Sequence, residues 1–223
     1  MFKLPGKGQR ANLLVEILMI VVGINVALWF EGWFEDLRDA EAEQQYLVEL
    51  RDDLLRDIEG LDHVIEAAAS KLSRTAKVVE QLPVLAGLPA EQQAQAIYVP
   101  ATYQFFEPSD FTYRSMQESG DFRLLSDTEI KKGILRLDRR YKEIAMLQKN
   151  FLQALDDGYI PIMMHSIDLV SMQISDPSIF ENQLFRNFFI YTQQDTNAML
   201  EIYKAARNQS EKLLELIEQD LAD

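Results

Sequence analysis

Cysteine is absent from this 223-residue sequence, and glycine and proline are scarce. Without cysteine the protein has no disulfide bond, no lipid-modified cysteine, no thiol nucleophile and no cysteine-ligated metal. With only 9 glycines and 7 prolines, the chain is neither fibrous nor of low complexity. The composition therefore indicates a folded protein with one substantial core.

Motifs for catalysis and metal binding are also lacking. The two histidines, His63 and His165, both lack a glutamate three residues earlier, so neither forms the Glu-x-x-His motif of di-iron bundles. The sequence has no G-x-S-x-G serine elbow and no glycine-rich phosphate loop. We therefore predict no enzymatic activity, no metal site and no cofactor.

Positive charge is concentrated near the N-terminus. Residues 1–30 carry a net charge of +2 and the remaining residues carry −16, which together give the total of −14. A domain this acidic repels phosphate backbones, so nucleic acid is a poor partner.

One long apolar run, residues 13–30, stands between these regions and reads LLVEILMIVVGINVALWF. Its 18 residues would form a helix of about 27 Å, close to the thickness of a bilayer's hydrocarbon core. Basic residues precede the run and acidic residues follow it, while Trp29 and Trp33 mark its end as an interfacial aromatic belt would. The alternatives are a cleaved signal peptide and a buried core helix, but the run lacks an A-x-A cleavage pattern and its flanks favour a membrane anchor.

These features predict the placement of the whole chain. We expect a cytoplasmic tail at residues 1–12, a transmembrane helix at 13–33 and an extracytoplasmic helical domain at 34–223. The protein would then lie in a bacterial inner (cytoplasmic) membrane, with its N-terminus in the cytoplasm and its C-terminal domain in the periplasm.

Four residues inside the apolar run are candidates for function. Gly23 and Ala27 form a small-xxx-small pair that allows close approach of another helix, and Asn25 could add an interhelical hydrogen bond. Glu16 has two interpretations: an ion-coupled membrane carboxylate, or a residue near the cytoplasmic boundary that reaches water or a basic neighbour.

Helical periodicity dominates the remaining sequence and predicts an all-α fold, with a coiled-coil-like long helix and an antiparallel helical bundle. The expected parts are a long helix at 34–82, an irregular region at 83–125, a helix at 126–156, a short helical segment at 159–172 and a C-terminal helical region at 177–221. The long helix carries a predicted heptad seam. One row of this seam is Leu47, Leu54, Leu61, Ala68, Thr75 and Leu82, and the other is Ile58, Ile65, Leu72 and Val79.

Local signals predict where some of these elements begin and end. Residues 126–129 resemble a capping box, Ser109 could cap a helix that ends at Gly120, and Asp157-Gly158 predicts a turn. The only candidate strand is a weak one at residues 97–103.

A methionine-rich segment is the best candidate for an adaptable partner surface. Met163, Met164 and Met172 lie in the apolar stretch 159–172, and methionine side chains adapt to irregular surfaces. The alternative is a short core helix. The aromatic stretch at residues 98–113 likewise allows two interpretations, a ligand pocket or a plug at the end of the bundle.

Two stretches carry a resemblance to a known family. The first is the pattern E-I-x-x-I-x-x-G-I-x-x-A-L at residues 16–28, followed by Trp33 and Glu35, and the second is S-G-D-F at 119–122 followed by Leu124-Leu125 and Tyr141. This pattern resembles a family of uncharacterised bacterial single-span membrane proteins with a helical periplasmic domain. Residues 29–32 depart from the more amide-rich stretch of that family. The resemblance implies a single-span topology and no particular activity.

The functional hypotheses follow from this architecture. The first is a membrane-anchored, non-enzymatic scaffold or accessory subunit that self-associates or docks envelope proteins. The second is a ligand-sensing bundle that acts through a partner, and the third is an ion-coupled membrane subunit that uses Glu16. The expected partners are the lipid bilayer and either further copies of the chain or other envelope proteins.

Overall fold

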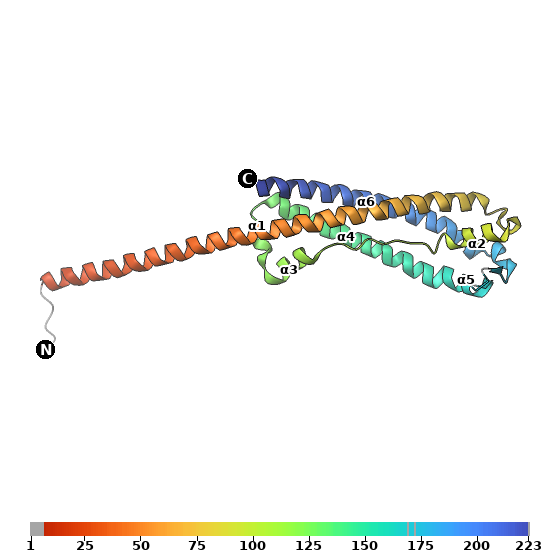
Figure 1. Cartoon of the computed structure of the whole chain (residues 1–223). Helices are drawn as coiled ribbons and strands as arrows, with labels where there is room; N and C mark the ends of the chain where they lie inside the picture. Colours follow the sequence, from red (N-terminus) through yellow and green to blue (C-terminus); the bar gives the residue numbers. More distant parts are fainter. Residues whose placement is uncertain (1–6, 169, 172, 223) are drawn as a thin grey trace, which may run out of the picture. The chain divides into compact units, whose positions relative to one another are not determined.

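The computed structural model describes residues 7–168, 170–171 and 173–222 (Figure 1). The chain forms two units, residues 1–47 and 48–223, and each is described by itself. The first helix, α1 (Lys7–Gln81), begins in the first unit and ends in the second.

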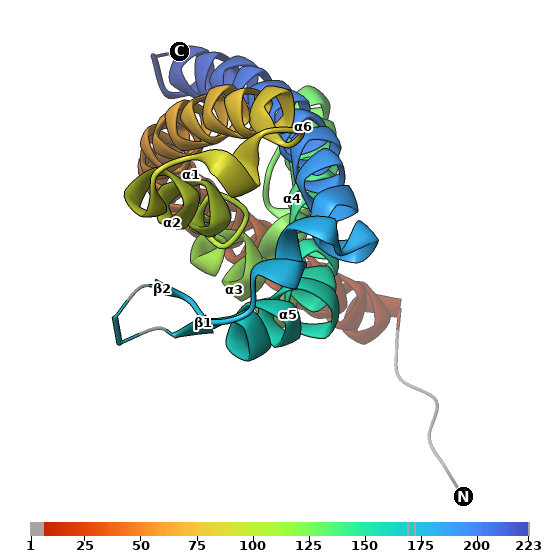
Figure 2. The same ribbon diagram turned by 90° about the vertical axis from the view of Figure 1, so that its right-hand side faces the viewer.

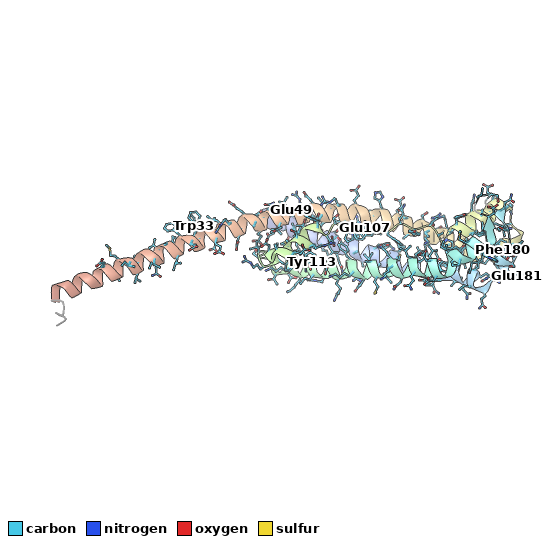
Figure 3. All side chains as sticks on the ribbon, turned by 90° about the horizontal axis from the view of Figure 1, so that it is seen from below. Trp33, Glu49, Glu107, Tyr113, Phe180 and Glu181 are labelled. Carbon is cyan, nitrogen blue, oxygen red and sulfur yellow. The ribbon has the colours of Figure 1, made fainter. Side chains whose placement is uncertain are left out.

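In the first unit, the described residues form a helix with exposed apolar side chains. This helix contains an 18-residue window of mean hydropathy 1.4, none of it buried. At the end of the apolar run, the ring centroids of Trp29 and Phe30 lie 5.3 Å apart, and those of Trp33 and Phe34 lie 5.4 Å apart. Figure 3 shows Trp33 projecting from the helix. The helix is therefore long and apolar enough to cross a membrane.

The second unit is a helical bundle, which confirms the predicted all-α fold. Figures 1 and 2 show α1, α4 and α6 side by side, joined by shorter elements. After α1 the elements are η1 (Leu85–Gly87), α2 (Ala90–Tyr98), α3 (Phe111–Ser119), η2 (Asp121–Arg123), α4 (Thr128–Ala154), the π-helical turn η3 (Leu155–Tyr159), α5 (Ile160–Ser166), β1 (Ile167–Asp168), β2 (Gln173–Ile174), η4 (Pro177–Glu181) and α6 (Gln183–Ala222).

Contacts along the bundle give the directions of its three long helices. Tyr141 of α4 contacts Asp57 of α1 and Ser210 of α6. Further along α4, Phe151 contacts Lys71 and Tyr191. Lys71 comes after Asp57 on α1, whereas Tyr191 comes before Ser210 on α6. Hence α1 and α4 run in the same direction and α6 runs antiparallel to both. The parallel pair is possible because residues 99–110 run along the bundle back to α3 (Figure 1).

Helix termini follow local chemistry, with two shifts from expectation. Ser109 was predicted to cap α3, but the N-cap of α3 is Asp110, whose side chain makes no capping hydrogen bond. The capping box was predicted to open at Ser126, but the N-cap of α4 is Asp127, whose side chain accepts hydrogen bonds from the backbone N–H groups of Glu129 and Ile130. Aspartate is as good an N-cap as serine, and here it has the extended backbone that a cap needs. At the end of α3, Gly120 has a φ of 82° and forms the left-handed cap that its position predicted.

The segment after α4 differs from the sequence-based expectation. The predicted turn at Asp157-Gly158 lies instead within the π-helical turn η3, and helical structure continues into α5. Pro161 lies in the first turn of α5 and has no N–H to donate, which suits it to a helix start. The predicted helical segment 159–172 ends at Ser166, and a short antiparallel hairpin pairs Ile167 with Ile174, beside α5 (Figure 2).

Candidate functional site

The buried face of α1 contains charged residues at core positions. The predicted first row of the seam is correct for Leu54, Leu61 and Thr75, which are buried. The second row lies one residue earlier than predicted. It consists of Leu50, Asp57, Val64, Lys71 and Val78. The predicted row at Ile58, Ile65, Leu72 and Val79 is only half-buried. Asp57 and Lys71 therefore take positions where a bundle usually has apolar side chains.

Asp57 holds residues 99–110, which we call the returning segment, against α1. Asp57 is 3% exposed, and its carboxylate accepts hydrogen bonds from the backbone N–H of Ser109 at 2.6 Å and from the Tyr141 hydroxyl at 2.7 Å. One turn earlier, the carboxylate of Asp53 accepts a hydrogen bond from the backbone N–H of Thr112 at 3.3 Å. Because Thr112 is in the first turn of α3, Asp53 satisfies a helix N-terminus that makes no side-chain cap of its own.

Gln148 of α4 binds the same returning segment further along. Its side-chain amide accepts a hydrogen bond from the backbone N–H of Phe106 at 2.9 Å and donates one to the carbonyl oxygen of Phe106 at 3.1 Å. The Tyr203 hydroxyl of α6 donates to the same Gln148 oxygen at 2.9 Å. These buried polar groups therefore supply hydrogen bonds to a backbone that has no neighbouring strand.

Burial dominates the electrostatics around Asp57. Loss of hydration raises the pKa of the Asp57 carboxyl, while the hydrogen bonds from Ser109 and Tyr141 lower it. Burial and the neighbouring carboxylate also raise the pKa of the Tyr141 hydroxyl, which therefore stays protonated and acts as a donor. A cavity of about 200 Å³ adjoins this cluster and is lined in part by Leu54, Phe106 and Leu137. Since the Asp57 oxygens are occupied by hydrogen-bond donors, this cluster has a structural explanation.

A second group of polar residues interrupts the core further along the bundle. We call it the polar layer. It consists of Lys71, Thr75, Thr192, Asp195 and Thr196. On α1 these residues lie between Val64, in one hydrophobic cluster, and Val78, in the other. On α6 they lie between Phe189 and Met199, which belong to the same two clusters. The polar residues of the two helices thus share one level of the bundle.

Lys71 is the buried cation of this layer. Lys71 is only 7% exposed, and its Nζ lies 4.2 Å from the centroid of the Phe151 ring. The same Nζ donates a hydrogen bond to the carbonyl oxygen of Pro100 at 3.3 Å. Burial lowers the pKa of Lys71 to about 8, although the negative charge of Asp195 acts in the opposite direction.

Asp195 is less well satisfied than Asp57. Burial raises its pKa to about 6, and the positive charge of Lys71 partly offsets that rise. Among the described residues, nothing hydrogen-bonds to Oδ2 of Asp195 or to the Oγ1 of Thr192, although both atoms are buried. An unpaired buried oxygen is costly, and the packing around this carboxylate does not explain it.

The polar layer opens onto a cavity of about 300 Å³. Lys71 and Arg74 line it from α1, and Asp195 lines it from α6. The aromatic rings of Phe105 and Phe151 contribute apolar surface. This cavity combines opposite charges with aromatic walls, and it is the candidate functional site of the bundle. The aromatic stretch 98–113 therefore supplies cavity walls: Tyr103 and Phe105 line this cavity, and the buried Phe106 and Tyr113 line the cavity beside Asp57.

The residues proposed from sequence lie elsewhere. Glu16, Gly23, Asn25 and Ala27 are exposed on α1. Apart from its chain neighbours and the helix's own backbone, no described atom lies within 4 Å of the position that a Cβ would take at Gly23. The Asn25 side chain donates to the carbonyl oxygen of Val21 at 2.7 Å, within the helix. The two histidines are exposed, and the described residues contain no cluster of His, Asp and Glu suited to a metal ion.

The methionine surface is divided between core and exterior. Met163 belongs to the buried core cluster, so its side chain is not available at the surface. Met164 is 62% exposed, and Met172 lies outside the described residues. Figure 3 places Phe180, which packs against the same core cluster, at the end of the bundle away from Tyr113.

Sequence reasoning missed Lys71 and Asp195. A signal was present, because Lys71 stands seven residues after Val64 in the repeat that begins at Leu50. Asp195 stands three residues after Thr192, which lies on the apolar stripe of α6. A charge at a seam position of a strongly periodic helix is the pattern that reveals such a residue.

Comparison with known proteins gives one match. A family model described as a family of unknown function (DUF6090) matches residues 16–154. No curated protein matches the chain, and no solved structure does. The match covers more than half of the sequence and begins at Glu16, the first residue of the pattern in the apolar run. The chain therefore belongs to DUF6090, a family of unknown function.

Proposed function

We propose that this protein is a single-pass protein of the bacterial cytoplasmic membrane that acts as a non-enzymatic scaffold or accessory subunit. Its N-terminus lies in the cytoplasm, and its acidic helical domain lies in the periplasm. The observation that carries this proposal is the apolar stretch of α1, which is unburied and ends in the aromatic residues Trp29 and Trp33. Exposed apolar surface of this extent is costly in water and favourable in a bilayer.

Self-association is assigned to the membrane helix and not to the heptad seam. In the second unit, the seam residues Leu54, Leu61 and Thr75 are covered by the chain's own bundle, so they offer no surface to a second copy. Gly23 and Ala27 are exposed at small-xxx-small spacing, and they allow two helices to approach closely in lipid.

The placement is tested with the full-length chain in cells. A phosphatase that is active only in the periplasm, fused after Asp223, is expected to be active, and the protein is expected to stay in membranes washed with alkaline carbonate. Two results would overturn the proposal. One is activity of a reporter that works only in the cytosol when it is fused after Asp223, and the other is release of the protein by carbonate.

Association is tested by cross-linking in native membranes. Replacing Gly23 with isoleucine is expected to abolish the cross-linked oligomer, because the added side chain separates the two helices. Val22→Leu is the matched control, since it adds volume on a flanking face of the same helix. A wild-type protein that never cross-links, or an oligomer that survives Gly23→Ile, contradicts the assignment.

A second candidate function is ligand binding by the bundle, with a partner protein carrying any signal. The unpaired Oδ2 of Asp195 beside a charged cavity favours it. A ligand that binds only the folded domain would raise its melting temperature, which gives a general test.

A further inference from the structure

The cavity at the polar layer has cationic groups on one wall and an anionic group on another. Lys71 and Arg74 are three residues apart on α1 and therefore lie on one face of that helix. Asp195 comes from α6, which runs antiparallel to α1. The two kinds of charge thus reach the same space from different helices.

These charges are not used up by pairing with each other. Lys71 donates to the Pro100 carbonyl oxygen and lies against the Phe151 ring, and its attraction to Asp195 acts through space. An ammonium group has three donors, so it can bind a further acceptor. Asp195 Oδ2 still lacks a donor among the described residues.

A purely structural role explains this arrangement poorly. A buried charge is expensive, and apolar residues at these positions would fill the core at lower cost. At Asp57 the same expense is offset, because its carboxylate receives hydrogen bonds from Ser109 and Tyr141. No comparable donor reaches the buried Oδ2 of the half-buried Asp195, so Asp195 differs in kind from Asp57, whose carboxylate is paired.

Size and charge together define what the cavity suits. At about 300 Å³ it falls at the lower end of the range for small-molecule sites, so it suits a small metabolite. A simple anion would pair with Lys71 and leave Asp195 unpaired, and a simple cation would be repelled by Lys71. A molecule with both charges satisfies both groups, while Phe105 and Phe151 offer apolar surface to its carbon skeleton.

We propose that the cavity between α1 and α6 binds a small zwitterion of the α-amino-acid class. Its carboxylate is held by Lys71, with Arg74 at the rim, and its ammonium group is held by Asp195. This inference rests on the ligand-binding candidate function and is independent of the membrane-scaffold proposal.

The test uses full-length protein in a nonionic detergent and isothermal titration calorimetry. The probes are the proteinogenic L-amino acids, first in mixtures and then singly, with acetate and methylammonium as singly charged probes. At least one amino acid is expected to bind at millimolar or lower concentration. Lys71→Met and Asp195→Asn are each expected to weaken that binding at least tenfold.

Controls separate binding from folding. Lys204→Met removes an exposed lysine of α6 that pairs with Glu201, and it is expected to leave the affinity unchanged. Lys71→Arg keeps the positive charge and is expected to retain binding better than Lys71→Met. Circular dichroism spectra and melting curves verify that each variant is folded.

The outcomes distinguish the zwitterion site from the more general ligand-binding function. If no amino acid binds the folded wild-type protein, the zwitterion site is overturned. The ligand-binding function falls as well if no compound tested raises the melting temperature of the domain. If acetate or methylammonium binds as well as any amino acid, the zwitterion assignment is overturned while ligand binding stands. Amino-acid binding that survives both Lys71→Met and Asp195→Asn places the ligand outside this cavity and also overturns the proposal.

Discussion

Replacing Asp57 with alanine or asparagine tests the idea that buried side chains hold the returning segment. In Asp57→Ala, the backbone N–H of Ser109 loses its acceptor, whereas Tyr141 keeps Ser210 at 3.1 Å as a second partner. One unsatisfied buried donor costs about 1–3 kcal/mol, and the space left by the carboxylate adds about 1 kcal/mol. We therefore expect Asp57→Ala to lower the free energy of unfolding by about 2–4 kcal/mol.

Asp57→Asn should behave differently because the amide can replace both bonds. Its oxygen accepts from the Ser109 N–H and its NH₂ donates to the Tyr141 oxygen, whose own proton then turns to Ser210. Asparagine also avoids the cost of a buried charge, so this variant should lie within about 1 kcal/mol of the wild type or be more stable.

The pKa of Asp57 determines the sign of the pH dependence of stability. The folded-state pKa of Asp57 is raised above its ordinary value of 3.8, so the folded protein holds this proton more tightly than the unfolded chain. Stability contributed by the protonated form is therefore lost as pH rises from 3.8 through the folded-state pKa. The advantage of Asp57→Asn over the wild type should grow across this window and stay constant above it.

The assay is urea unfolding of the full-length protein in nonionic detergent, followed by near-ultraviolet circular dichroism of its tyrosines. Asp62→Ala is the matched control on α1, because Asp62 forms an exposed ion pair with Arg207 that is worth at most about 1 kcal/mol. The reasoning is refuted if Asp57→Ala costs no more than Asp62→Ala, or if Asp57→Asn costs as much as Asp57→Ala.

Three further predictions use the same assay. The folded-state pKa of Lys71 is about 8 against an ordinary 10.5, so the unfolded chain binds more protons between these values. The free energy of unfolding of the wild type should therefore rise by up to about 3 kcal/mol relative to that of Lys71→Met as the pH rises from about 8 to 10.5. A difference that stays constant with pH would contradict this. Gln148→Leu orphans the N–H and carbonyl of Phe106 and should cost about 2–4 kcal/mol; a cost below 1 kcal/mol would show that water replaces the amide. Tyr159→Phe leaves a carbonyl oxygen of α2 without its 2.6 Å donor and should cost about 1–2 kcal/mol, unlike the exposed Tyr103→Phe, and equal effects would count against it.

Helix α1 shows what periodicity predicts and where it fails. The first seam row follows from leucines at seven-residue spacing, and Leu54 and Leu61 are buried as expected. The second row was misplaced by one residue because the prediction chose the apolar Ile58 over its neighbour Asp57. A prediction based on hydrophobicity alone moves the row to an apolar neighbour whenever a seam position carries a charge. The burial of a charge depends on its partners, and those partners come from distant segments.

The candidate site depends on such distant contacts, because Lys71 binds the carbonyl oxygen of Pro100, 29 residues away. The same holds for the bonds of the returning segment. Asp57 and Ser109 are 52 residues apart, and Gln148 and Phe106 are 42 residues apart. No local pattern in the sequence announces these pairs, because each depends on how α1 and α4 pack. The hairpin of Ile167 with Ile174 was missed for another reason: two residues per strand are too few to show alternation.

The returning segment has a consequence for how the bundle opens. The backbone amides of Phe106 and Ser109, and that of Thr112 at the start of α3, donate to side chains of α1 and α4 and not to a neighbouring backbone. Such bonds can form only after those helices have met, and they break once the helices part. Hydrogen exchange at these three positions should therefore be as slow as that of the most protected helical amides, so an apparently loose stretch of chain would serve as an internal gauge of global unfolding.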